Sequence, residues 1–235
     1  MSKKIITLLV LLITVPTIIF GCFMLIDGKQ YYLASSLIVA LALGALFFSM
    51  EKKKLSTREL VAIACIVALA VAGRAVLFIL PQVKLTCAIA ILAAISFGPD
   101  VGFLCGSLSM LVSNIFFGQG THTPFQMFGM GLVAFLCGLL FYNNRLGRNR
   151  WIVALVGGFL SFAVYGFIVD SSSALFFSSP LSLKTMIPVY ISGIGFNAIH
   201  GISTFAFLLI ATPYIKDTFE RVAKKYELFG AKRKD

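Results

Sequence analysis

Residues 114–126 read NIFFGQGTHTPFQ and join two long apolar segments. The two glycines and the proline indicate a turn that ends one helix and starts the next. Polar residues fill this turn, and two more lie just inside the flanking segments: Asn114, Gln119, Thr121, His122, Thr123 and Gln126. We expect the turn to be the mouth of a ligand pocket. The alternative is an ordinary solvated loop.

The segments on either side belong to a chain that is apolar almost throughout. Of its 235 residues 59% are hydrophobic and 12% are charged, whereas soluble domains carry about 25% charged residues. Several apolar runs exceed the roughly 18 residues that span a bilayer. The runs are continuous rather than alternating, which favours helices over barrel strands. The sequence therefore predicts an all-α, multi-pass protein of the cell membrane.

Eight helices are predicted. Two of them, within residues 1–50, precede a charged break where Ser56 or Thr57 with Glu59 indicates a helix start. A six-helix membrane core is expected over residues 51–215, with a basic cytoplasmic tail at 216–235. Gly98 and Pro99 break the core between its second and third helices, and Asp100 is expected to cap the third. The six core helices are predicted near 57–80, 87–97, 100–117, 125–142, 151–170 and 188–214.

The cations set the expected orientation. The net charge of +11 lies in clusters between apolar runs, which is typical of cytoplasmic loops and argues against a nucleic-acid partner. With eight crossings and a cytoplasmic N-terminus, all but four of the 20 Lys and Arg fall on the cytoplasmic side. We therefore expect both termini in the cytoplasm and the turn at 118–122 outside.

Polar side chains inside the predicted helices gather toward the outside. Arg74 lies about 9 Å below the end of its helix at 1.5 Å per residue, and Asp170 ends the fifth core helix. An ionisable group inside a membrane is costly and suggests a function. On the last helix, spacings of three and four place one set on a single face: Tyr190, Gly193, Asn197, His200 and Thr204.

These positions predict a substrate pocket open to the outside. Two alternatives need no ligand: Arg74 pairs with Asp170 or reaches toward the surface, and Asn197 with His200 joins two helices. The candidate substrate-binding residues are Arg74, Asn114, Gln119, His122, Gln126, Tyr190, Asn197 and His200.

Small residues repeat on the first core helix at Ala64, Ala68 and Ala72, a pattern that favours close contact with another helix. The chain has no nucleotide-binding glycine loop and no hydrolase or metalloprotease motif. Its five cysteines lie singly within apolar segments, which makes a metal site improbable. We therefore expect no metal and no cofactor, and, from the missing motifs, no enzyme activity.

Three features together resemble the substrate-binding S components of energy-coupling factor (ECF) transporters. The first is Thr57-Arg58-Glu59-Leu60 leading into the alanine repeat. The second is Phe97-Gly98-Pro99 followed by Gly102 and Gly106, and the third is the polar turn. The resemblance covers about residues 57–213 and leaves the first two helices unassigned.

The resemblance implies a subunit that captures a vitamin outside the cell. It implies that Ala64, Ala68 and Ala72 contact a transmembrane coupling (T) subunit, and that two cytoplasmic ATPase subunits supply energy. Aromatic side chains could stack on a planar ligand, and amide side chains suit its polar edges; the aromatics are Phe116, Phe117, Phe125 and Tyr190. His122 or His200 could approach a corrin cobalt. We rank cobalamin or a corrinoid first, then riboflavin and pantothenate. The alternatives are a stand-alone carrier or facilitator and, third, an intramembrane enzyme using His200 or Asp170 as base.

Overall fold

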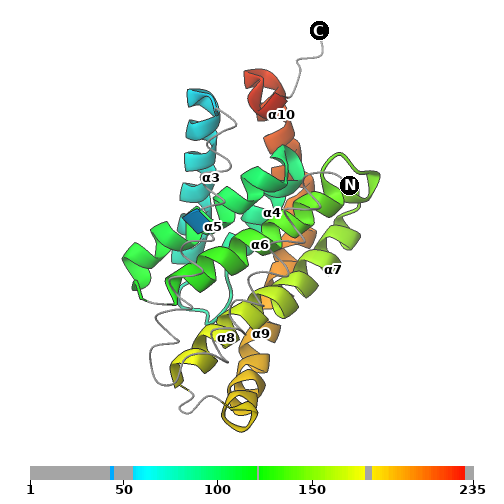
Figure 1. Cartoon of the computed structure of the whole chain (residues 1–235). Helices are drawn as coiled ribbons and strands as arrows, with labels where there is room; N and C mark the ends of the chain where they lie inside the picture. The colour runs from blue at the N-terminus through cyan, green and yellow to red at the C-terminus, as the bar shows by residue number, and fades with distance from the viewer. Residues whose placement is uncertain (1–42, 45–54, 121, 178–181, 231–235) are drawn as a thin grey trace, which may run out of the picture.

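The computed structural model describes residues 43–44, 55–120, 122–177 and 182–230. Within these residues the chain is helical (Figure 1), which confirms the predicted all-α class. The two helices predicted within residues 1–50 lie outside the described residues, apart from 43 and 44. The main helices are α3 (Thr57–Val76), α4 (Leu85–Phe97), α5 (Pro99–Phe117), α6 (Thr123–Phe141), α7 (Arg150–Leu160), α8 (Gly166–Phe177), α9 (Leu183–Ala211) and α10 (Asp217–Tyr226).

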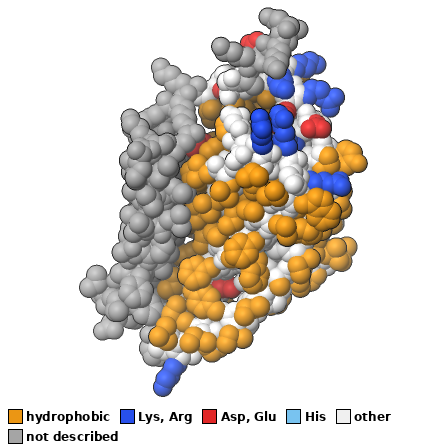
Figure 2. Space-filling view, turned by 90° about the vertical axis from the view of Figure 1, so that its right-hand side faces the viewer, with side chains coloured by type: hydrophobic (Ala, Val, Ile, Leu, Met, Phe, Trp, Pro, Cys, Tyr) orange, Lys and Arg blue, Asp and Glu red, His pale blue; other side chains and the backbone are white. Residues whose placement is uncertain are grey.

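Two pairs of these helices are continuous. The π-helical turn η2 (Ser161–Tyr165) joins α7 to α8, and η3 (Thr212–Lys216) joins α9 to α10. Among the described residues, five helical stretches are long and apolar enough to cross a membrane, and α4 is shorter. On the face in Figure 2, apolar side chains cover the middle and lower part, while Lys and Arg gather near the top. This distribution is that of a multi-pass membrane protein.

The start of α3 follows the predicted signal. The Ser56 hydroxyl accepts from the Glu59 amide at 3.4 Å, and the Glu59 carboxylate accepts from the Ser56 amide at 2.7 Å. This reciprocal pair satisfies two amides that the first turn of a helix leaves unbonded.

The expected cap of α5 at Asp100 is wrong. Gly98 holds the cap position with φ 107°, Pro99 is the first helical residue, and Asp100 lies in the first turn. Proline is suited to that first position because its missing amide would have no partner there. Glycine adopts the positive φ before it without steric cost.

Two helix ends differ from the prediction. The serines after Asp170 were expected to leave the helix, but α8 continues to Phe177. The Ser171 and Ser173 hydroxyls donate to the backbone carbonyls four residues earlier, at 2.6 and 3.2 Å. Their hydrogen-bonding needs are therefore met inside the helix. The last helix begins at Leu183 and, through η3, runs to Tyr226, so the expected start of the tail at 216 lies within it.

Helix α4 forms the centre of the bundle. Nearly all of its residues are buried, and α3, α5, α6 and α9 contact it. Gly102 of α5 lies so close to Ala94 that a Cβ at this position would overlap the alanine methyl group. Because protein rather than lipid surrounds α4, its 13 residues do not need to match the bilayer thickness.

Helix α3 lies at the side of the bundle (Figure 1). It buries one narrow face, formed by Ile63, Ile66, Val67 and Ala70. Ala64, Ala68 and Ala72 are exposed on another face. The alanine repeat is therefore accessible at the side of the bundle, rather than used for packing among the described helices.

Candidate functional site

The polar residues of the candidate site lie at the end of the bundle that carries the turn around Gly118. We call this the site end, and the end with the Gly98 turn the hairpin end. Helices α3 and α5 end there, α6 begins there, and α8 and α9 meet there. Two separate polar clusters occupy this part of the bundle.

The first cluster surrounds Arg74. Its Nη1 donates to Ser113 Oγ at 2.5 Å and to Asn114 Oδ1 at 2.9 Å. The guanidinium also lies over the ring of Phe117, 4.9 Å from the centroid, and Phe78 stacks on that ring at 4.8 Å. Among the described residues no ion pair joins Arg74 to Asp170, so that alternative is not seen. Arg74 is held inward by α5 instead.

Asn114 is the hub of this cluster. It is 1% exposed, and its Oδ1 accepts from Arg74. Its Nδ2 donates to Gln126 Oε1 at 2.8 Å and to Thr123 Oγ1 at 3.3 Å. One amide thus connects α3, α5 and α6. Such a network fixes the positions of several donors and acceptors at once.

The second cluster lies between α8 and α9. Asn197 Nδ2 donates to Asp170 Oδ2 at 2.7 Å. The Tyr190 hydroxyl is 2.9 Å from Ser171 Oγ, and its ring stacks on Phe167 at 5.7 Å between centroids. Contrary to its expected place at the helix end, Asp170 lies within α8 and is 9% exposed.

Glycines allow this second cluster to form. The Asp170 carboxyl group lies against the backbone of Gly193, closer than a Cβ at that position would permit. Asn197 lies in the same way against Gly166, where an added Cβ would be 2.6 Å from Cγ of Asn197. The two helices therefore approach closely at the two polar side chains.

His200 is buried against Tyr165 of η2 and the segment before α4. Its ring packs on Tyr165 at 4.9 Å, and its Nδ1 is 3.3 Å from the Gln82 carbonyl oxygen. Among the described groups, its Nε2 has no hydrogen-bond partner. The expected joint role of His200 with Asn197 is not seen, because each bonds elsewhere. A polar ligand atom or a water would satisfy Nε2.

The segment that connects α3 to α4 contributes Lys84 to this region. Burial, with a smaller contribution from the Arg74 charge, lowers the pKa of Lys84 from 10.5 to about 8. Sequence reasoning did not select Lys84, Ser113 or Ser171. Ser113 could have been found as the neighbour of Asn114, whereas the place of Lys84 depends on how its segment folds back.

Two predicted residues stand outside the hydrogen bonds of the clusters, although burial and, to a smaller extent, the nearby Arg74 charge lower the pKa of His122. Gln119 is exposed and donates to the Leu111 carbonyl at 2.9 Å, at the end of its own hairpin. His122 is exposed and its ring lies against Gly120. Of the aromatics considered for a planar ligand, Phe125 is in the core and Phe116 is 73% exposed. Phe117 and Tyr190 are the two that lie beside polar clusters.

The structure is a bundle of helices long and apolar enough to cross a membrane, with polar clusters buried at one end. Among the described residues, no group of side chains could hold a metal ion. These are features of a solute-binding membrane subunit. Residues 54–217 match the family model described as "ECF-type riboflavin transporter, S component". The match covers well over half of the chain, so the protein belongs to this family of ECF S components. This confirms the resemblance noted from the sequence, and the family is one of transporters rather than enzymes. No curated protein and no solved structure matches the chain.

Proposed function

We propose that this protein captures riboflavin for an ECF importer of the cytoplasmic membrane. The observation that carries the proposal is the family match over residues 54–217, together with the two polar clusters enclosed at the site end. The family's name favours riboflavin, which the sequence analysis ranked second, and gives no support to the corrinoid that it ranked first. The site end would face outward, as the distribution of cations predicts.

The chemistry of the two clusters suits riboflavin. The vitamin has a planar tricyclic ring with an imide edge and a ribityl chain with hydroxyl groups. Asn197 donates to Asp170 through Nδ2, and its amide oxygen is an acceptor of the kind that an imide N–H requires. Tyr190 and Phe167, stacked beside this pair, offer aromatic surface to the ring.

The Arg74 cluster would then bind the hydroxyl groups or a ring carbonyl. A guanidinium has five N–H donors, and the bonds from Nη1 to Ser113 and Asn114 use two. The remaining donors suit a neutral ligand with alternating donors and acceptors, and the Gln126 oxygen, which already accepts from Asn114, has a second lone pair for such a ligand. His200, whose Nε2 has no partner among the described groups, would supply one further contact.

Energy for transport would come from partner subunits. The exposed face with Ala64, Ala68 and Ala72 would contact the transmembrane coupling subunit, to which two cytoplasmic ATPases bind. This assignment rests on the family and on the accessibility of the alanines at the side of α3.

Native mass spectrometry of the gently purified protein tests the proposal. Protein from cells supplied with riboflavin, cobalamin and pantothenate should retain the mass of riboflavin and, when co-expressed, the coupling subunit and ATPases. Retention of a corrinoid or pantothenate instead would refute the proposed substrate. Riboflavin uptake into vesicles that contain this protein alone would favour a stand-alone carrier.

A further inference from the structure

The C-terminal end of the described chain folds back onto the start of α3. After α10, Glu227 adopts a left-handed conformation with φ 52°, which ends the helix, and Phe229 adopts the same φ of 52°. We call residues 227–230 the hook. Left-handed backbone is unfavourable for residues other than glycine, so the contacts of the hook must offset this cost.

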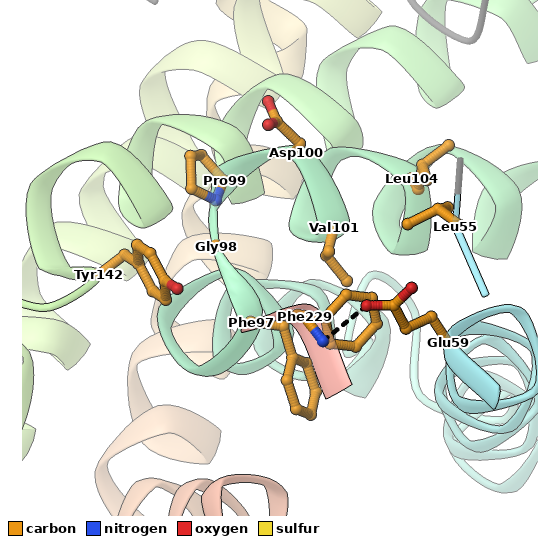
Figure 3. Close-up of a pocket in the computed structure, with 10 residues that line it drawn as sticks. All are labelled: Leu55, Glu59, Phe97, Gly98, Pro99, Asp100, Val101, Leu104, Tyr142 and Phe229. Carbon is orange, nitrogen blue, oxygen red and sulfur yellow. Dashed lines mark hydrogen bonds between the residues drawn. The ribbon is translucent and has the colours of Figure 1, made fainter. Parts of the chain in front are cut away.

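The hook is joined to α3 by a long-range hydrogen bond. The Phe229 amide donates to Glu59 Oε1 at 2.7 Å, while Glu59 Oε2 accepts from the amide and hydroxyl of Ser56. One carboxylate therefore caps α3 and holds the hook, 170 residues away in sequence. Figure 3 shows Phe229 and Glu59 facing each other.

Aromatic packing fixes the other side of the hook. The Phe97 ring at the end of α4 lies 5.1 Å from the Phe229 ring and 5.3 Å from that of Phe219 on α10. Leu228 is 3% exposed. The hook thus bridges α3, the central helix α4 and α10.

A pocket of about 250 Å³ lies beside the hook at the hairpin end. Phe229 and Glu59 form part of its wall, with Gly98, Asp100 and Tyr142 among the other lining residues (Figure 3). Because Glu59 and Phe229 border open space on this side, the hydrogen bond between them can break without compressing a neighbour there, while the Phe97–Phe229 contact still holds the hook to the bundle. The hook is therefore suited to hold α3 reversibly.

We propose that the hook is a latch that fixes the first turns of α3 and thereby positions the exposed alanine face for the coupling subunit. Helix α3 is buried along one narrow face only, so contacts such as the Glu59–Phe229 bond help to hold its first turn. Ala64 lies five residues after Glu59, within about 8 Å along the helix axis. The choice of partner rests on the proposed function, whereas the local effect on α3 does not.

Two truncations of the full chain test the latch. Removal of residues 227–235 deletes the hook, and removal of 231–235 deletes only the last five residues, three of them Lys or Arg, and keeps the hook. Hydrogen exchange should become faster by about tenfold or more at residues 57–62 in the first variant only. Phe229→Ala, which retains the amide but loses the ring contact, should show an intermediate effect.

Co-purification with the coupling subunit and ATPases completes the test. We expect the first truncation to lose most of this assembly while its riboflavin affinity stays within about twofold of the full chain, because the site lies at the other end of the bundle. Unchanged exchange, unchanged assembly, or equal losses in both truncations would overturn the latch. A loss of riboflavin binding that accompanies the lost assembly would also overturn it. Failure of the full chain to bind riboflavin would refute the proposed function and leave the exchange result to decide on the latch.

Discussion

The replacement Gly193→Ala tests whether the close approach of α8 and α9 builds the substrate site. At Gly193 a Cβ would overlap the Asp170 carboxyl group, which accepts the 2.7 Å hydrogen bond from Asn197. The added methyl group must therefore move Asp170 or push α9 away from α8. Either displacement breaks the bond that orients the Asn197 amide.

The expected magnitude follows from three contributions. Alanine favours the helix by about 1 kcal/mol relative to glycine. Overpacking costs about 1–3 kcal/mol, and loss of a hydrogen bond to a carboxyl group costs about 1–3 kcal/mol. The net destabilisation is therefore about 1–5 kcal/mol. If riboflavin uses the oriented amide, loss of that contact alone weakens binding by about 5- to 150-fold.

Gly195→Ala is the matched control for this prediction. Gly195 lies on the same helix, and a Cβ there would meet nothing within 4 Å, so it gains the helix preference without the overlap. Riboflavin fluorescence quenching and thermal unfolding in detergent measure both variants. Equal affinity and equal melting temperature for the two variants would refute the argument, because the contact with Asp170 would then have no consequence.

Three further predictions concern separate parts of the molecule. Asn114→Ala should lower the free energy of unfolding by about 2–4 kcal/mol and weaken riboflavin binding at least tenfold, because it removes the shared partner of Arg74 and Gln126. In the same unfolding and quenching assays, Ile115→Ala at the exposed neighbouring position should change neither stability nor affinity. Ala68→Trp should abolish assembly with the coupling subunit while riboflavin binding stays intact, whereas Leu69→Trp, on an adjacent face of α3, should not; impaired binding by Ala68→Trp would contradict the assigned face. Burial lowers the pKa of Lys84 from 10.5 to about 8. Between these pH values the unfolded chain therefore binds more protons than the folded chain, so the free energy of unfolding should rise from pH 8 to pH 10 by roughly 2–3 kcal/mol. Lys84→Met should remove this rise in pH-dependent melting, and an unchanged rise would assign it to another group.

Local signals were enough to predict most of the helices. Ser56 with Glu59 marked the start of α3, and Gly98 with Pro99 marked the break before α5, since each sets the backbone through its own chemistry. The extension of α8 past Asp170 could not be predicted, because serine leaves or stays in a helix according to whether its hydroxyl can bond within it. The continuation of α9 through Pro213 likewise depends on the π-helical turn η3.

The candidate site could be predicted in outline but not in its pairings. The spacing of Asn197 and His200 placed both on one face of α9, and both face neighbouring helices or segments in the structure. Their partners depend on tertiary contacts: Asp170 reaches Asn197 because glycines allow α8 to approach. Gln119 was included for its polarity, and it bonds its own hairpin instead. Polarity predicts that a side chain will form a hydrogen bond, but not which partner the fold brings to it.

Titration of the purified protein with riboflavin, in the absence of ATP and of any partner subunit, is the decisive measurement of whether this chain captures riboflavin by itself. We expect saturable quenching of riboflavin fluorescence with one ligand per chain. The affinity should be at least tenfold weaker in Asn114→Ala and should not change when cobalamin is present at the same concentration. An absence of quenching, or displacement of riboflavin by cobalamin, would contradict the assignment of these polar clusters to riboflavin capture.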